Sequence, residues 1–230
     1  MKKIVSAIRG ILLQIIKNND LGRIQKKEFV VISNNCFGAE IYKWVEKPYN
    51  TPFIGLFLHG DCYIKLLQDF DNIIEKKLVF INVSKYNNLS LSTYPIACFE
   101  GTSIEIHFMH YKSKEEAEEK WQRRLSRMLK ISNKSNYYFK ICDRDGGTLD
   151  ILQEFHQLSF PNKISFSINS LPSISNGHIC VNEKNNSQQV PDGIALYQLS
   201  HKYVDLIKWI EFGLIQKNIK STLKYYFRIY

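Results

Sequence analysis

The sequence predicts an α/β fold of three layers, in which a mixed, mostly parallel sheet carries helices on both faces. Short apolar runs alternate with segments whose apolar residues recur at helical spacing, which is typical of a parallel sheet covered on both sides. Two apolar runs in the middle of the chain flank Gly101-Thr102, and this predicts a hairpin with antiparallel strands. At 230 residues and 44% hydrophobic, the chain is large enough to bury a full core.

The first half of the chain supplies most of the predicted strands. Residues 29–33 form an apolar run that predicts a buried strand, and residues 37–46 predict a helix that stops before Pro48. Residues 52–58 predict a second strand, and residues 62–74 carry apolar side chains at helical spacing. Three more predicted strands follow, at 77–83, 95–100 and 103–109.

The second half begins with the clearest helix start in the chain. Ser113 followed by Glu116 predicts a capping box, and the helix it opens extends to about residue 130. The remaining predicted elements are a strand at 137–142, a helix at 148–158 capped by Thr148, a strand at 163–168, one strand at 178–182 within the loop-rich 170–193, and a helix from 201 to about 212.

The positive charge divides the chain into three predicted parts. A basic N-terminal helix, residues 1–27, has a net charge of +6, and a basic aromatic C-terminal helix and tail, residues 201–230, has +4. The α/β domain, residues 28–200, is the remainder of the chain and has a net charge of −1. Nucleic-acid binding would favour a basic stripe across the fold, so this distribution argues against it.

Two basic ends are instead typical of contact with an anionic surface, and we expect a cytoplasmic protein that lies on the inner face of a membrane. The apolar part of residues 4–16 is too short and too interrupted to span a bilayer. The alternative is a helix packed on the domain with a lysine-rich outer face. Five scattered cysteines without a CxxC pair indicate reduced thiols and exclude a disulfide framework.

The turn after the first strand is the first candidate site. Ser33, Asn34 and Asn35 follow a predicted strand and precede a helix, where ligands of α/β sheets bind and helix N-termini offer free N–H groups. These side chains either contact a ligand or cap the helix. No nucleotide-binding glycine motif is present. Cys36 fits either a nucleophile or a small buried residue, and we prefer the buried residue.

Histidines supply the candidate catalytic groups. His59 stands at the end of the second predicted strand beside Asp61, which is expected to cap the next helix. Strand alternation places Glu105 and His107 on one face, either as a site wall or as a solvated face. His110 and Tyr111 then lie between a strand end and a helix start, the usual place for ligand contacts.

The helix at 113–130 combines an apolar stripe with a basic cluster. Its basic residues pair with glutamates four positions away in Glu116–Lys120 and Glu119–Arg123, as on a solvated helix. Alternatively, their guanidinium groups bind phosphate or carboxylate bidentately. The candidate anion-binding residues are Lys120, Arg123, Arg124 and Arg127.

Asp143 and Asp145 follow the strand at 137–142. An Asp-x-Asp at a strand end holds a divalent cation against a diphosphate in many nucleotide-sugar transferases, because hard cations take oxygen ligands. The competing interpretation, which we prefer, is a turn at Asp145-Gly146.

Four segments together resemble a bacterial family of unknown function whose members are often called exopolysaccharide biosynthesis proteins. They are ISNNCFGAEIY (32–42), YNTPFIGLFL (49–58), HFMHYKSKEEAEEKWQRRLSRM (107–128) and FPNKISFS (160–167). The resemblance covers roughly residues 28–168 and implies an α/β domain with a link to polysaccharide assembly. It carries no known reaction or catalytic residue.

Two functions remain open from the sequence. The first is a transferase that moves a glycosyl or substituent group to or from a sugar or nucleotide sugar, with His59, His107 or His110 as acid or base and a divalent metal if one is used. The second is a non-catalytic accessory protein of polysaccharide assembly that binds a sugar or a partner protein. If the second holds, the helix arginines are exposed and ion-paired, and the polar residues do not converge.

Overall fold

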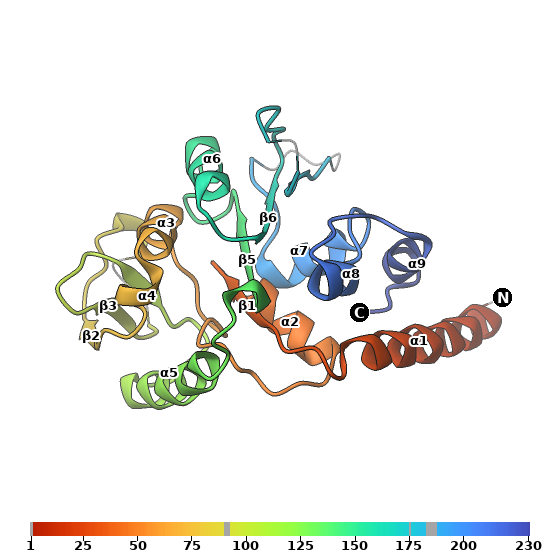
Figure 1. The fold of residues 1–230 in the computed structure, drawn as a ribbon, viewed down its shortest axis with the longest axis horizontal. Coiled ribbons are helices and arrows are strands. Elements are labelled where there is room, and N and C mark those ends of the chain that lie inside the picture. The colour runs from red at the N-terminus through yellow and green to blue at the C-terminus, as the bar shows by residue number, and fades with distance from the viewer. Residues whose placement is uncertain (1, 90–92, 175, 183–187) are drawn as a thin grey trace.

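A parallel sheet forms the centre of the molecule, in a computed structural model that describes residues 2–89, 93–174, 176–182 and 188–230 (Figure 1). Its strand order within the described residues is β1-β5-β6-β7, and each neighbouring pair is parallel. The strands are β1 (Val30–Ser33), β5 (Tyr137–Cys142), β6 (Asn162–Ser167) and β7 (His178–Cys180).

Both faces of this sheet are buried, because side chains along each strand alternate between two hydrophobic clusters. Val30 and Ile32 of β1 belong to one cluster, whereas Val31 between them belongs to the other. The first cluster is covered by α3 (Gly60–Gln68), α4 (Phe70–Ile73), α5 (Lys114–Leu129) and α6 (Leu149–Gln157), and the second by α1 (Lys2–Ile24), α2 (Phe37–Trp44), α7 (Gly193–Ser200) and α8 (Leu206–Phe212). The predicted α/β fold with helices on both faces is confirmed.

The antiparallel part forms a small sheet of its own. Strands β2 (Leu78–Ile81), β3 (Ile96–Phe99) and β4 (Glu105–His107) pair in that order, and the hairpin expected around Gly101 is confirmed. Figure 1 shows this sheet beside α3 and α4, to one side of the parallel sheet. A single bridge between Phe57 and His107 joins it to the segment that precedes α3.

Some sequence predictions were wrong in detail. Residues 52–58 form no strand, because Gly55 adopts a left-handed conformation (φ +71) that breaks the extended run. Asp69 divides the helix predicted at 62–74 into α3 and α4. The helix expected from residue 201 begins at Leu206, and the helices α7 and α9 (Ile219–Phe227) were not predicted.

Two predicted caps are present. Ser113 Oγ accepts a hydrogen bond from Glu116 N at 3.2 Å, and Thr148 Oγ1 accepts one from Ile151 N at 3.3 Å. The capping box at Ser113 is only half formed, because the Glu116 carboxylate accepts from Lys112 N instead of Ser113 N. Asp61 is not a cap: α3 begins one residue before it, and its carboxylate faces Tyr86 and Lys85.

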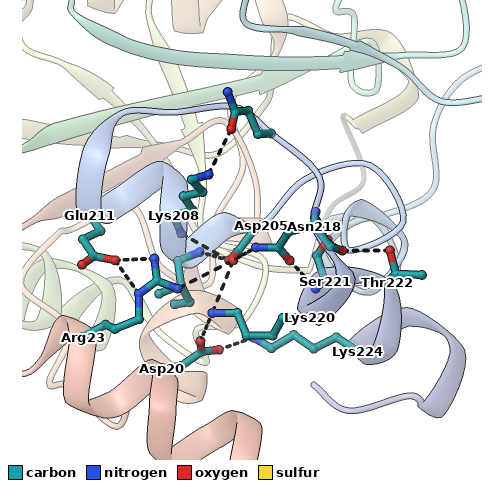
Figure 2. Close-up of polar contacts among 12 residues, drawn as sticks. Asp20, Arg23, Asp205, Lys208, Glu211, Asn218, Lys220, Ser221, Thr222 and Lys224 are labelled. Carbon is teal, nitrogen blue, oxygen red and sulfur yellow. Dashed lines mark hydrogen bonds and ion pairs between the residues drawn. The ribbon is translucent and has the colours of Figure 1, made fainter.

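A buried ionic cluster fastens α1 to the C-terminal helices (Figure 2). The Asp20 carboxylate pairs with Lys220 and Lys224, with 2.6 Å between Lys224 Nζ and Asp20 Oδ2, and accepts a hydrogen bond from Trp44 Nε1. Arg23 pairs with Glu211 in the same region. The two basic ends of the chain therefore pack against each other. In the described part of the chain, no helix combines the length and apolar character needed to cross a membrane.

We expect Asp20→Asn to lower the free energy of unfolding by about 3–5 kcal/mol, because it leaves the buried Lys224 ammonium without its counter-charge. Denaturant unfolding measures the change. The matched control is Asp71→Asn, which breaks an exposed pair with Lys134 and should cost less than about 1 kcal/mol. Equal costs for the two variants would contradict a stabilising role for the buried cluster.

Asp205 should make stability depend on acid pH. Burial raises the pKa of this carboxyl, but Lys220 and hydrogen bonds from Asn218 and Lys208 outweigh burial, so its pKa in the folded protein lies below the usual value. The unfolded chain then takes up the proton first, and the stabilisation present at neutral pH is lost as the pH falls below about 4. Asp205→Asn keeps a capping side chain and should flatten this part of the pH–stability curve; an unchanged slope would refute the assignment.

Candidate ligand-binding site

A pocket of about 450 Å³ opens beyond the carboxyl ends of β1 and β5, the edge at which α/β sheets bind ligands. Segments from across the chain build it: the β1–α2 turn, the segment before α3, the β4–α5 connection, the turn after β5 and the start of α7. Its lining residues are Asn35, Cys36, Phe57, Leu89, Tyr94, Met109, His110, Arg144, Asp145, Asp192, Gly193 and Ile194.

The N-termini of α2 and α7 meet at this pocket. A Cβ on Gly193 would lie 2.6 Å from Phe37 N and 2.9 Å from Asn35 Oδ1, so only glycine permits this approach. The expected Asn cap is wrong: the N-cap of α2 is Cys36, and Asn35 Oδ1 accepts from Phe37 N at 3.3 Å from the position before it. Asp192 caps α7, and its Oδ1 accepts from Ile194 N at 2.9 Å. Both helix starts thus direct N–H groups and positive dipole ends toward the same edge.

A buried lysine, Lys140, holds the lining residue Asn35 in place. Lys140 Nζ on β5 lies 2.9 Å from Asn35 Oδ1, 3.2 Å from Asn34 Oδ1 and 3.2 Å from Cys142 Sγ. Burial lowers the pKa of Lys140. Asn35 lines the pocket, whereas Asn34 and Ser33 lie behind it and are fully buried. Of the three predicted ligand contacts in this turn, the structure therefore brings one to the pocket.

Asp143 and Asp145 have different surroundings. Asp143 uses both carboxylate oxygens to accept hydrogen bonds of 2.8 Å from Ile168 N and Val190 N, so it holds two loops together. Asp145 lines the pocket, and burial raises its pKa. Across the described residues, no group of three or more His, Cys, Asp or Glu side chains is placed to hold a metal ion. The preferred turn interpretation agrees with Asp145, whose φ is +58.

His59 lies against Asp145 through a close contact between two turns. Gly60 N donates to Asp145 O at 2.9 Å, and a Cβ on Gly60 would lie 2.6 Å from Gly146 O, so the backbones touch. Burial lowers the pKa of the His59 imidazole, and the Asp145 charge opposes this shift. The neutral imidazole also stacks on Tyr86, with ring centroids 3.6 Å apart. The turn that carries the predicted histidine thus packs against the turn that carries Asp145, but His59 itself is not among the lining residues.

His107 lies behind the pocket, where its ring stacks on Phe57 at 4.6 Å. Burial lowers its pKa to about 4, although Glu105 opposes the shift. His107 Nε2 is 3.3 Å from Glu105 Oε2, but neither ring nitrogen makes an aligned hydrogen bond within the described part of the chain. Glu105 accepts from Ser84 Oγ and Lys85 N at 2.7 Å each. This face of β4 is therefore buried and not solvated, with a neutral His107.

The four predicted anion-binding residues of α5 are engaged in packing or in ion pairs. Arg124 is buried and donates to the Tyr111 hydroxyl, which in turn donates to Ile54 O. Arg127 donates to Tyr49 O at 3.0 Å. The predicted pairs Lys120–Glu116 (2.6 Å) and Arg123–Glu119 (2.8 Å) are confirmed. None of these four cations, nor Tyr111, is among the lining residues, and His110 is the one predicted residue of this region that is.

Several pocket residues were not predicted. Phe57, Tyr94 and Met109 provide an apolar wall, and no local pattern marks them. Arg144, between the two predicted aspartates, has its guanidinium Nε 4.0 Å from Asp145 Oδ1. Pro191-Asp192-Gly193 could have been recognised as a helix start within the loop-rich stretch, because Asp is a preferred cap.

The arrangement suits a ligand with two unlike parts. The aromatic and aliphatic wall can stack against a sugar ring or a base. At the polar edge, Arg144, His110 and two helix starts can hold an anionic group, and Asp145 can accept a proton. Because the α5 arginines point elsewhere, Arg144 is the guanidinium group that the pocket offers among the described residues.

Comparison with known proteins identifies relatives without an assigned activity. Residues 7–212 match the family described as a domain of unknown function (DUF1919). An uncharacterized protein of Haemophilus influenzae is 34% identical over 177 residues, which cover 77% of this chain and 80% of the relative. The expected family of unknown function is confirmed. Neither match carries the link with exopolysaccharide biosynthesis, which stays a prediction.

Cys36 lines the pocket but should not behave as a nucleophile, because burial raises the pKa of its thiol to about 11. At pH 8 we expect alkylation by iodoacetamide to be on the order of a hundredfold slower than that of free cysteine. The rate should rise about tenfold per pH unit up to pH 9.5. Mass spectrometry of the labelled peptide measures it, with half-exposed Cys180 as the accessible control. Labelling as fast as free cysteine would reinstate the nucleophile.

Proposed function

The chain belongs to the DUF1919 family, and from the geometry of its pocket we propose that it binds a phosphorylated sugar, such as a nucleotide sugar, and transfers a group from it. The observation that carries the proposal is the convergence of Asn35, His110, Arg144 and Asp145 with an aromatic wall at the carboxyl edge of the parallel sheet.

Recognition of the ligand divides between the two sides of the pocket. Phe57 and Tyr94 lie against the sugar or base, because flat apolar rings match the faces of both. The Arg144 guanidinium and the N–H groups at the starts of α2 and α7 bind phosphate oxygens. Asn35 is held by Lys140 through its amide oxygen and fixes the orientation of the bound group.

Asp145 is the proposed base. Burial raises the pKa of Asp145, which makes its carboxylate a better proton acceptor than an exposed one. In the transfer, the oxygen of an acceptor hydroxyl forms a bond to the transferred carbon, and the proton passes to Asp145. The bond from that carbon to the phosphate oxygen breaks, and the phosphate leaves with the electron pair. Gly60 N, which donates to Asp145 O, fixes the backbone of Asp145 from the neighbouring turn.

The wider role is proposed from the family resemblance in four segments of the sequence. We propose that the transfer belongs to exopolysaccharide assembly, where phosphorylated sugars are the donors. This assignment is by association with the family, and the pocket supports only the class of ligand.

A second candidate is a binding protein without catalysis. It is favoured by one specific observation: the α5 cations are ion-paired or engaged in packing, as expected for an accessory protein. Under this alternative the same pocket binds the same class of ligand, and Asp145 accepts hydrogen bonds from sugar hydroxyls instead of a proton.

Calorimetric titration with a panel of nucleotide sugars tests the proposal. We expect Arg144→Gln to weaken binding at least about tenfold, because it removes a charge-assisted contact to phosphate. The matched control is Arg123→Gln, which alters an exposed arginine paired with Glu119 and should leave the affinity unchanged. If no donor binds, or both variants bind alike, the proposed ligand is wrong.

The same experiment separates the two candidates when it is joined to a turnover assay. Asp145→Asn should keep the affinity within about threefold and abolish donor consumption, since the amide cannot accept the proton. Binding without donor consumption by the unaltered protein, in the presence of sugar acceptors, would favour the accessory protein.

A further inference from the structure

The two basic ends of the chain form one positively charged body, which we call the basic lobe (residues 2–27 and 201–230). Arg9 Nη2 on α1 donates to Arg228 O at 2.9 Å, and Asp20 pairs with Lys220 of α9. Figure 1 shows α1, α8 and α9 together on one side of the molecule, away from the small antiparallel sheet.

The charge of this lobe is not neutralised from within. Its acidic residues are Asp20, Asp205 and Glu211, and all three are already paired with lysine or arginine of the lobe (Figure 2). The two segments carry +6 and +4 when these acids are counted, whereas the rest of the chain sums to −1. The positive charge of the molecule is therefore concentrated on one body.

Exposed apolar side chains gather on the same lobe. Of fifteen large hydrophobic residues that are exposed in the described structure, nine lie in the lobe, which is about a quarter of the chain. On α1, Ile8, Ile11 and Ile15 recur at i, i+3 and i+7 and so share one face, with exposed fractions of 45%, 62% and 60%. Exposed Ile219 and Tyr226 of α9 and Phe212 and Leu214 add to them. Such clustering marks an interaction surface.

We propose that the basic lobe binds the surface of an anionic lipid bilayer, with α1 lying along the interface and its isoleucines inserted among the headgroups. An exposed apolar helix face on a body of high positive charge is the chemistry that anionic membranes recognise. The inference is independent of what the pocket binds.

A second copy of the chain is a poorer occupant of this surface. Two lobes of like charge would repel each other. A nucleic acid would complement the charge but would leave the exposed isoleucines in water. An anionic lipid surface would complement the positive charge and also bury the exposed isoleucines.

Co-sedimentation of the full chain with vesicles tests the proposal. Binding is expected to vesicles containing phosphatidylglycerol and not to vesicles of phosphatidylcholine alone. Replacing Ile8, Ile11 and Ile15 together with serine should weaken binding at least about tenfold, because the inserted apolar area is lost. A matched control replaces the exposed Val79 and Val83, outside the lobe, with serine and should bind normally.

A charge variant keeps the test independent of α1. Lys26 and Lys217 are exposed, and changing each to glutamine should weaken binding about fivefold per charge. Full binding by the triple serine variant, or failure to bind anionic vesicles at all, would overturn the proposal. If light scattering shows that the unaltered protein is a dimer and the triple serine variant a monomer, the lobe binds a second copy of the chain. If duplex DNA displaces the vesicles equally well from the unaltered protein and from the triple serine variant, the lobe binds a nucleic acid. Either result would contradict the proposal.

Discussion

Lys140 of β5 is fully buried, and the geometry of the pocket depends on the groups that accept hydrogen bonds from its ammonium group. A lysine in the interior needs oxygen or sulfur partners, because an unpaired buried charge costs several kcal/mol. Here they are the amide oxygens of Asn34 and Asn35 and the Cys142 thiol, which lie at the ends of two neighbouring strands. The same contacts join the end of β1 to β5 and fix the side chain of Asn35, which lines the pocket. A structural requirement of the core thus sets the geometry of the candidate site.

Predictions from the sequence succeeded where the deciding interaction is local. Strand β5 was predicted with its observed ends, since residues 137–142 are bounded by turn residues on both sides. The ion pairs of α5 were also predicted, because i, i+4 spacing alone brings their side chains together. Among candidate site residues, Asn35, His110 and Asp145 were recognised because each follows a strand, and ligands bind at such positions.

Predictions failed where a distant partner decides the outcome. Arg124 has the same local pattern as an exposed arginine, but contacts with Tyr111 and Ile54 bury it. The apolar run at 52–58 matches a strand by composition, and yet the left-handed conformation of Gly55 limits its pairing to the single bridge between Phe57 and His107. The start of α7 belongs to the pocket only because Gly193 meets the start of α2. No pattern within a window of the sequence contains that information.

The contact between Gly193 and the Asn35–Phe37 turn has a consequence for how the protein is made. The two sides of the pocket are separated by more than 150 residues of chain, so the site cannot exist on a nascent chain until α7 has left the ribosome. The ion pair between Asp20 and Lys220 requires in addition the start of α9 (Ile219–Phe227). Until then the Asp20 carboxylate has the Trp44 indole as a partner but neither lysine of α9. The pocket is therefore completed only after residue 193 has been made, and the ion pair with α9 only after residue 220.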